Sequence, residues 1–129
     1  MTDMGTFRID IEIENASERE RRERAAVAAL LVDTGSELSW IPAETLEALG
    51  IARERLATFR QASGQVIERW VGFAIIHVGD IATNDDVVFA QAGDMPLLGA
   101  RTLEGLNVMV DPTTKRLVDA GPMLGAAAA

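Results

Sequence analysis

Residues 30–36 place an aspartate at the end of an apolar run, in the order Leu-Leu-Val-Asp-Thr-Gly-Ser. A carboxylate at the end of a buried strand is shielded enough to share a proton, yet water and a peptide can reach it. Thr34 adds a supporting hydroxyl, and Gly35 allows a tight turn that brings its N–H close to Asp33. These residues suit acid–base catalysis, with Asp33, Thr34 and Gly35 as the catalytic group. The tripeptide alone also fits an Asp-Gly turn that closes a core strand.

Hydrolysis of a peptide bond by carboxylates takes two of them sharing one proton. The chain has one Asp-Thr-Gly sequence. Asp10 lies on the polar face of a predicted strand, and the other candidates fall in predicted turns, namely Asp85, Asp86, Asp94, Asp111 and Asp119. The simplest source of the second carboxylate is Asp33 of another copy across a two-fold axis, so we expect a homodimer.

The elements that must position Asp33 are mostly short strands. Residues 7–14 alternate apolar and polar, which predicts a strand with one buried face. Residues 27–32 are apolar throughout, which predicts a strand covered on both faces. Residues 56–78 predict a long hairpin with Ser63-Gly64 as its two-residue turn. With only two short helices, one over residues 42–49, the pattern predicts an all-β barrel or sandwich.

A second motif follows the hairpin, where residues 96–101 read Pro-Leu-Leu-Gly-Ala-Arg before a short helix. Residues 32–36 and this motif together resemble the two signatures of retropepsin-like aspartic proteases. The order and spacing are similar to those of small single-domain bacterial and archaeal members over residues 4–119. The resemblance implies a closed β-barrel of the retropepsin type with one or two short helices. It also implies a hydrolase, an aspartic endopeptidase that cleaves peptide or protein substrates as a homodimer without a cofactor.

The resemblance implies roles for further residues. A segment behind the catalytic loop would hold that loop, and a hairpin flap would cover the bound peptide. The loop-supporting segment comprises Leu97, Leu98 and Gly99, and the flap comprises Ala62, Ser63, Gly64 and Gln65. The flap residues equally fit the tip of any β-hairpin. Thr34 would join a hydroxyl network across the dimer axis, and Ser36 could donate a hydrogen bond to the outer oxygen of Asp33 and favour its ionised form.

Length and composition restrict the other possibilities. The 129 residues predict one domain, 1–129, with a structured core over 4–119 and a frayed tail over 120–129 that ends in Ala126 to Ala129. A net charge of −8 argues against a nucleic-acid partner. There is no cysteine, and the single histidine, His77, has no acidic cluster at ligand spacing, so we expect no metal. Without a signal peptide or a long apolar stretch we expect a cytoplasmic protein with no membrane partner.

Two other functions compete with the endopeptidase. The first is a non-catalytic binding or regulatory module on the same fold, because a fold does not fix a function. The intact Asp33-Thr34-Gly35 argues against it, since a retired site has little need for an acid at the end of an apolar strand. The second is a nucleotide-binding domain, which would require a longer chain with a second glycine-rich loop.

Overall fold

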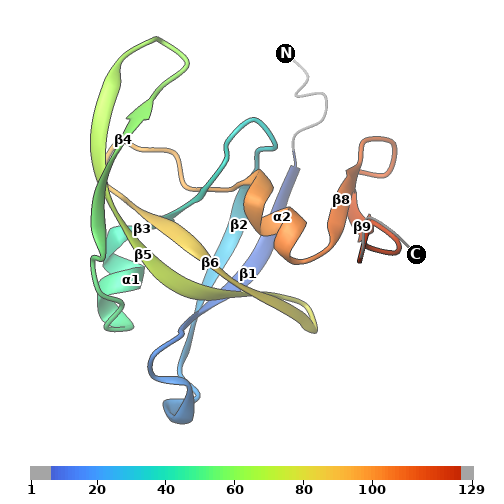
Figure 1. Cartoon of the computed structure of the whole chain (residues 1–129), viewed down its shortest axis with the longest axis horizontal. Helices are drawn as coiled ribbons and strands as arrows, with labels where there is room; N and C mark the ends of the chain where they lie inside the picture. The colour runs from blue at the N-terminus through green and yellow to red at the C-terminus, as the bar shows by residue number, and fades with distance from the viewer. Residues whose placement is uncertain (1–6, 126–129) are drawn as a thin grey trace.

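A computed structural model describes residues 7–125 of the chain (Figure 1). Its strands are β1 Phe7–Asn15, β2 Arg24–Val32, β3 Ser39–Pro42, β4 Arg55–Arg60, β5 Val66–Val78, β6 Ile81–Ala90, β7 Leu97–Leu98, β8 Val108–Asp111 and β9 Arg116–Asp119. Its helices are α1 Ala43–Ala48 and α2 Ala100–Gly105, with a 3₁₀ turn at Arg19–Arg21. The prediction of a mostly β chain with short helices is confirmed. Of the tail predicted to fray, residues 120–129, the structure describes 120–125, which form no helix or strand, and residues 126–129 lie outside the described residues.

Seven strands form one sheet in the order β1-β2-β7-β3-β6-β5-β4. Strand β1 also pairs with β5, so that strand pairing runs around a ring from β1 through β2, β7, β3, β6 and β5 back to β1. Strand β4 and the start of β5 form a hairpin that projects beyond the rest of the sheet, and β8 and β9 form a separate hairpin beside α2 (Figure 1). This connectivity brings β7, late in the chain, between β2 and β3.

A bulge in β2 changes which of its side chains face the core. One residue of β1, Asp10, lies opposite two of β2, and its carboxylate accepts a hydrogen bond of 2.9 Å from the Ala29 N–H. Ala29 takes the left-handed conformation with φ 53°. Because of the extra residue, the core-facing positions change from odd-numbered Val27 to even-numbered Leu30. The prediction that residues 27–32 are covered on both faces is therefore wrong: the strand buries one face and changes phase at the bulge.

Two apolar clusters fill the fold. The larger one lies inside the ring, and its fully buried members include Ile13, Ile41, Leu46, Ile76, Phe89 and Leu98. The smaller one consists of Leu38, Val71 and Val88, with Trp40, Ala57 and Phe59 packed against it. This second cluster connects the base of the β4–β5 hairpin to β3 and β6. No helix within residues 7–125 has the length and apolar character needed to cross a bilayer.

Two local predictions need correction. In the β4–β5 hairpin the Gln61 N–H donates to the Gln65 carbonyl at 2.8 Å, which leaves a three-residue loop over 62–64 instead of a two-residue turn. Gly64 closes that loop with φ 90°, as three-residue hairpin loops require. The prediction that five aspartates lie in turns is also wrong for most of them. Asp85 and Asp86 lie within β6, and only Asp94 of the five lies between strands. Hydrogen bonds to distant residues, which a local pattern does not report, hold these two aspartates inside a strand.

The larger cluster should provide most of the stability. Phe89→Ala should lower the free energy of unfolding by about 3–5 kcal/mol, because Phe89 is fully buried and a cavity would remain. Phe73→Ala is the matched control, since Phe73 is 47 % exposed, and it should cost only about 0.5–1 kcal/mol. Denaturant unfolding of both variants measures the difference. Equal losses would contradict this assignment of the core.

Candidate functional site

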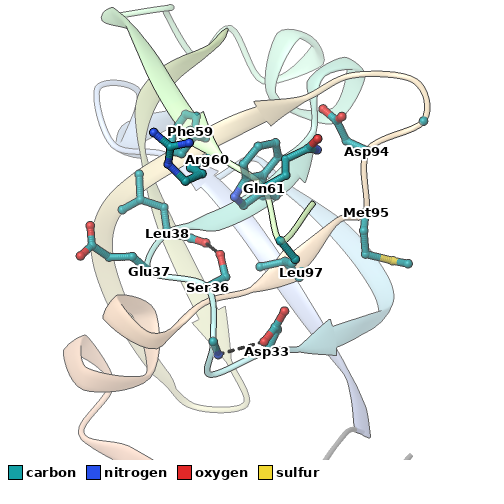
Figure 2. Close-up of a pocket in the computed structure, with 14 residues that line it drawn as sticks. Asp33, Ser36, Glu37, Leu38, Phe59, Arg60, Gln61, Asp94, Met95 and Leu97 are labelled. Atoms are coloured by element: carbon teal, nitrogen blue, oxygen red, sulfur yellow. Dashed lines mark hydrogen bonds between the residues drawn. The ribbon is translucent and has the colours of Figure 1, made fainter. Parts of the chain in front are cut away.

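The loop that carries Asp33 begins where β2 ends. The Asp33 N–H donates to the Leu98 carbonyl at 2.9 Å, and the Asp33 carbonyl accepts from the Ser36 N–H at 3.2 Å. The Gly35 N–H donates to the Asp33 carboxylate oxygen Oδ1 at 2.9 Å (Figure 2). A Cβ at position 35 would stand only 3.1 Å from that oxygen, so glycine allows the backbone to approach the carboxylate closely. The half-buried carboxylate is thereby fixed by its own loop.

The chain segment Leu97 to Arg101 lies directly behind this loop. Leu97 and Leu98 pair in parallel with the end of β2. The Ala100 N–H donates to the Ser36 carbonyl at 2.7 Å, and the Arg101 N–H donates to the Glu37 carbonyl at 3.0 Å. A Cβ at position 99 would overlap the backbone of Leu38, so only glycine permits this close approach. The loop therefore depends on main-chain contacts from a segment far away in the sequence.

Ser36 does not make the contact expected of it. Its hydroxyl donates to the Leu38 carbonyl at 2.9 Å, and a hydroxyl has one proton to donate. Within this chain Ser36 therefore supports the turn after Asp33, and the predicted donation to the outer oxygen of Asp33 is corrected. The reason is local, because Ser and Thr hydroxyls readily bond to backbone groups two residues along the chain.

A cavity of about 550 Å³ opens above the carboxylate (Figure 2). It is lined by Asp33, Gly35, Ser36, Glu37, Leu38, Trp40, Phe59, Arg60, Gln61, Ala62, Gly93, Asp94, Met95 and Leu97. Part of the lining is apolar and belongs to the smaller cluster, in which the rings of Trp40 and Phe59 meet edge to face at 5.1 Å between centroids. The cavity thus combines carboxylates and other polar groups with an apolar patch, as ligand-binding sites commonly do.

The predicted site residues are distributed unevenly around this cavity. Asp33, Gly35, Ser36, Ala62 and Leu97 line it. Leu98 and Gly99 lie behind the loop, and Thr34 is exposed beside the cavity without lining it. Of the predicted flap residues, Ser63, Gly64 and Gln65 are exposed at the hairpin tip and do not line the cavity. The hairpin residues that line the cavity are four consecutive ones at the end of β4 and the start of the loop, namely Phe59, Arg60, Gln61 and Ala62.

An ion pair between Arg69 and Asp94, which the sequence pattern does not predict, lies at the cavity wall. The Arg69 guanidinium of β5 donates to both carboxylate oxygens of Asp94, at 2.7 and 2.8 Å, and the Gln91 N–H donates to the same carboxylate at 2.8 Å. The Arg69 hydrogen bonds, followed by that of Gln91, hold the pKa of Asp94 below its usual value against the opposing effect of burial. The only sequence signal was an arginine at an inward position of an otherwise apolar strand face. The pair links the β4–β5 hairpin to the loop over residues 91–96.

The single histidine is engaged elsewhere. His77 Nε2 lies 2.7 Å from Glu14 Oε1, and both side chains are buried. This hydrogen bond is the main reason that the pKa of Glu14 lies below its usual value. Among residues 7–125 no group of three or more His, Asp or Glu side chains is placed to hold a metal ion.

The chain matches the model of a known protein family. The model of a family described as gag-polyprotein putative aspartyl protease matches residues 24–105. The matched region contains the Asp33 loop, the β4–β5 hairpin and the segment Leu97–Gly99 behind the loop. No curated protein sequence matches the chain.

The Arg69–Asp94 pair generates a pH-dependent prediction. The pKa of Asp94 is lowered in the folded protein, so the pair stabilises the fold fully above the ordinary value of 3.8 and loses this effect as the pH falls through the lower folded value. Asp94→Asn should therefore reduce the free energy of unfolding by about 1–2 kcal/mol at pH 7.

Urea unfolding between pH 7 and pH 3 measures this effect. The difference between Asp94→Asn and the wild type should shrink once the pH drops below 3.8. Asp80→Asn, which removes an exposed carboxylate from the turn after β5, is the matched control and should follow the wild type at every pH. A deficit in Asp94→Asn that stays constant down to pH 3 would show that the ion pair is not its cause.

Proposed function

The chain belongs to the gag-polyprotein putative aspartyl protease family, and we propose on this premise that it is an aspartic endopeptidase active as a homodimer. One observation carries the proposal: the Asp33 carboxylate, held by the Gly35 N–H, lines a cavity whose wall includes apolar side chains of the smaller cluster. Such a cavity can take an extended peptide and exclude water around the reacting groups. The ring of paired strands supports the finer assignment of a closed retropepsin-type barrel.

The proposed reaction uses two Asp33 carboxylates that share one proton. The ionised carboxylate takes a proton from water, whose oxygen attacks the scissile carbonyl carbon. The protonated carboxyl donates a hydrogen bond to the carbonyl oxygen as negative charge develops there. When the tetrahedral intermediate collapses, a proton passes to the amide nitrogen and the C–N bond breaks. The two products are a carboxylic acid and an amine, so no cofactor is consumed.

A second copy is the source of the second carboxylate. The other acidic groups that line the cavity are Glu37 and Asp94. Asp94 is occupied by Arg69, and the Glu37 side chain points away from Asp33 (Figure 2). Thr34 and Gly35 are exposed, so the loop is accessible to the same loop of another copy across a two-fold axis. In this proposal Thr34 meets its counterpart there, and the β4–β5 hairpin covers the peptide.

Asp33→Asn should abolish peptide cleavage and leave the fold intact. Asparagine is nearly isosteric with aspartate and its oxygen can still accept from the Gly35 N–H, but it cannot take a proton from water. Cleavage of a fluorogenic peptide library, with circular dichroism on the same samples, measures both effects. Asp80→Asn should cleave as the wild type does, and persistent cleavage by a pure Asp33→Asn sample would exclude Asp33 as the catalytic group.

A mixing experiment tests the homodimer separately. Asp33→Asn added to an equal amount of wild type should, after subunit exchange, reduce cleavage to about half, because half of the wild-type subunits then carry an inactive partner. Asp80→Asn added in the same way should not reduce it. The non-catalytic binding module, by contrast, has no activity to lose, and a chain that acts alone would be unaffected by the mixing.

A further inference from the structure

A chain of buried hydroxyl groups runs from the segment behind the Asp33 loop to strand β6. The Gly99 N–H donates to Ser39 Oγ at 2.9 Å, and Ser39 Oγ lies 2.6 Å from Thr102 Oγ1. Thr102 Oγ1 donates to Asp85 Oδ2 at 3.0 Å. Ser39 and Thr102 are fully buried, and the Asp85 side chain is only 8 % exposed. The chain of bonds thus joins β3, α2 and β6 behind the loop.

The chemistry of the two end groups, the Asp85 carboxylate and the Gly99 N–H, determines the direction of the bonds between them. An ionised carboxylate only accepts hydrogen bonds, so the single proton of the Thr102 hydroxyl goes to Asp85. Ser39 must then donate to Thr102, and the Ser39 oxygen remains available to the Gly99 N–H. Within residues 7–125 no buried side-chain nitrogen or oxygen lacks a partner. Asp85 therefore orients the two hydroxyl groups, and the Gly99 N–H donates to the oxygen of the first.

Asp85 is itself held at its second oxygen. Asp85 Oδ1 accepts from the Asp86 N–H at 2.8 Å and lies 4.0 Å from the Arg101 guanidinium. The Asp86 carboxylate accepts from Arg55 at 2.9 Å and also lies 3.9 Å from the Arg101 guanidinium, but it makes no bond to the hydroxyl chain. An aspartate inside a strand is locally unfavourable. A residue with a low strand propensity inside a strand is expected where its side chain has a functional role.

The other end of the chain of bonds reaches the Asp33 loop. Gly99 follows Leu98, whose carbonyl accepts the Asp33 N–H. Gly99 is also followed by Ala100 and Arg101, whose N–H groups hold the Ser36 and Glu37 carbonyls. A displacement at Gly99 is therefore transmitted to three main-chain bonds of the loop.

We propose that Asp85, acting through Thr102 and Ser39, is a positioning residue that fixes the loop carrying Asp33. The expected effect on peptide cleavage rests on the proposed function. The expected effect on the position of the loop rests on the hydrogen bonds alone. Charge-assisted bonds are stronger than bonds between neutral groups, and buried networks reinforce one another. Asp85 touches neither substrate nor the reacting atoms.

Two matched pairs of variants test this role. Thr102→Val removes the hydroxyl at nearly constant shape, and Thr102→Ser keeps it. Asp85→Asn leaves one acceptor where the carboxylate offered two. Asp86→Asn removes the neighbouring charge, which faces Arg55 and Arg101 but lies outside the hydroxyl chain. Two quantities are measured on each folded variant, well below its melting temperature: kcat and KM for a cleaved peptide, and amide hydrogen exchange at Asp33 and Gly99.

Thr102→Val and Asp85→Asn should lower kcat by about ten- to a hundredfold and change KM by less than about twofold, because loop misplacement affects the reacting atoms more than peptide binding. Exchange at Asp33 and Gly99 should accelerate in both variants, with the amides of β5 and β6 unchanged. Thr102→Ser and Asp86→Asn should resemble the wild type in every measurement.

The outcomes separate this proposal from the endopeptidase. If the wild type cleaves peptides and Thr102→Val and Asp85→Asn keep its kcat and its exchange rates, the positioning role is wrong and the endopeptidase stands. If the wild type cleaves nothing but exchange accelerates only at the loop in these two variants, the positioning role stands and the endopeptidase fails. Exchange that accelerates uniformly over the whole chain would also overturn the positioning role, since it would indicate general destabilisation.

Discussion

The hydrogen bond from the Asp33 N–H to the Leu98 carbonyl is the contact on which the candidate site depends. It continues the parallel pairing of β2 with β7 one residue beyond the strand, to the point where the carboxylate begins. Parallel pairing needs a long connection between its strands, and here that connection contains the projecting hairpin and most of the cavity wall. The pairing of β2 with β7 therefore holds Asp33 and also brings the cavity wall and the hairpin to it.

The carboxylate and the cavity wall are fixed by different contacts. Main-chain bonds from Leu98, Ala100 and Arg101 hold the Asp33 loop. The wall is held by the smaller apolar cluster and by the Arg69–Asp94 pair, which joins β5 to the loop over residues 91–96. The two sets of contacts meet at Leu38, whose carbonyl accepts from Ser36 of the loop and whose side chain belongs to the smaller cluster.

Much of the architecture could be predicted from local patterns. Period-two alternation placed β1, and the glycine-containing turns separated β4, β5 and β6. Two of the failures share one cause, which is that a tertiary hydrogen bond overrides the local preference. The Asp10 carboxylate stabilises the bulge at Ala29 and so shifts the phase of β2. Bonds from Thr102 and from Arg55 keep Asp85 and Asp86 inside β6, although aspartate usually favours turns.

The sequence by itself determined the type of chemistry and its minimum requirement: an acid after an apolar strand, a glycine beside it, and one such motif in the chain. These features are local, so residue types and spacing suffice to report them. Only the tertiary structure decided which distant groups meet Asp33 and its cavity, among them Leu98 and Asp94. Their contacts depend on strand register and on the direction of individual hydrogen bonds, and both are fixed only when the whole ring of strands has paired.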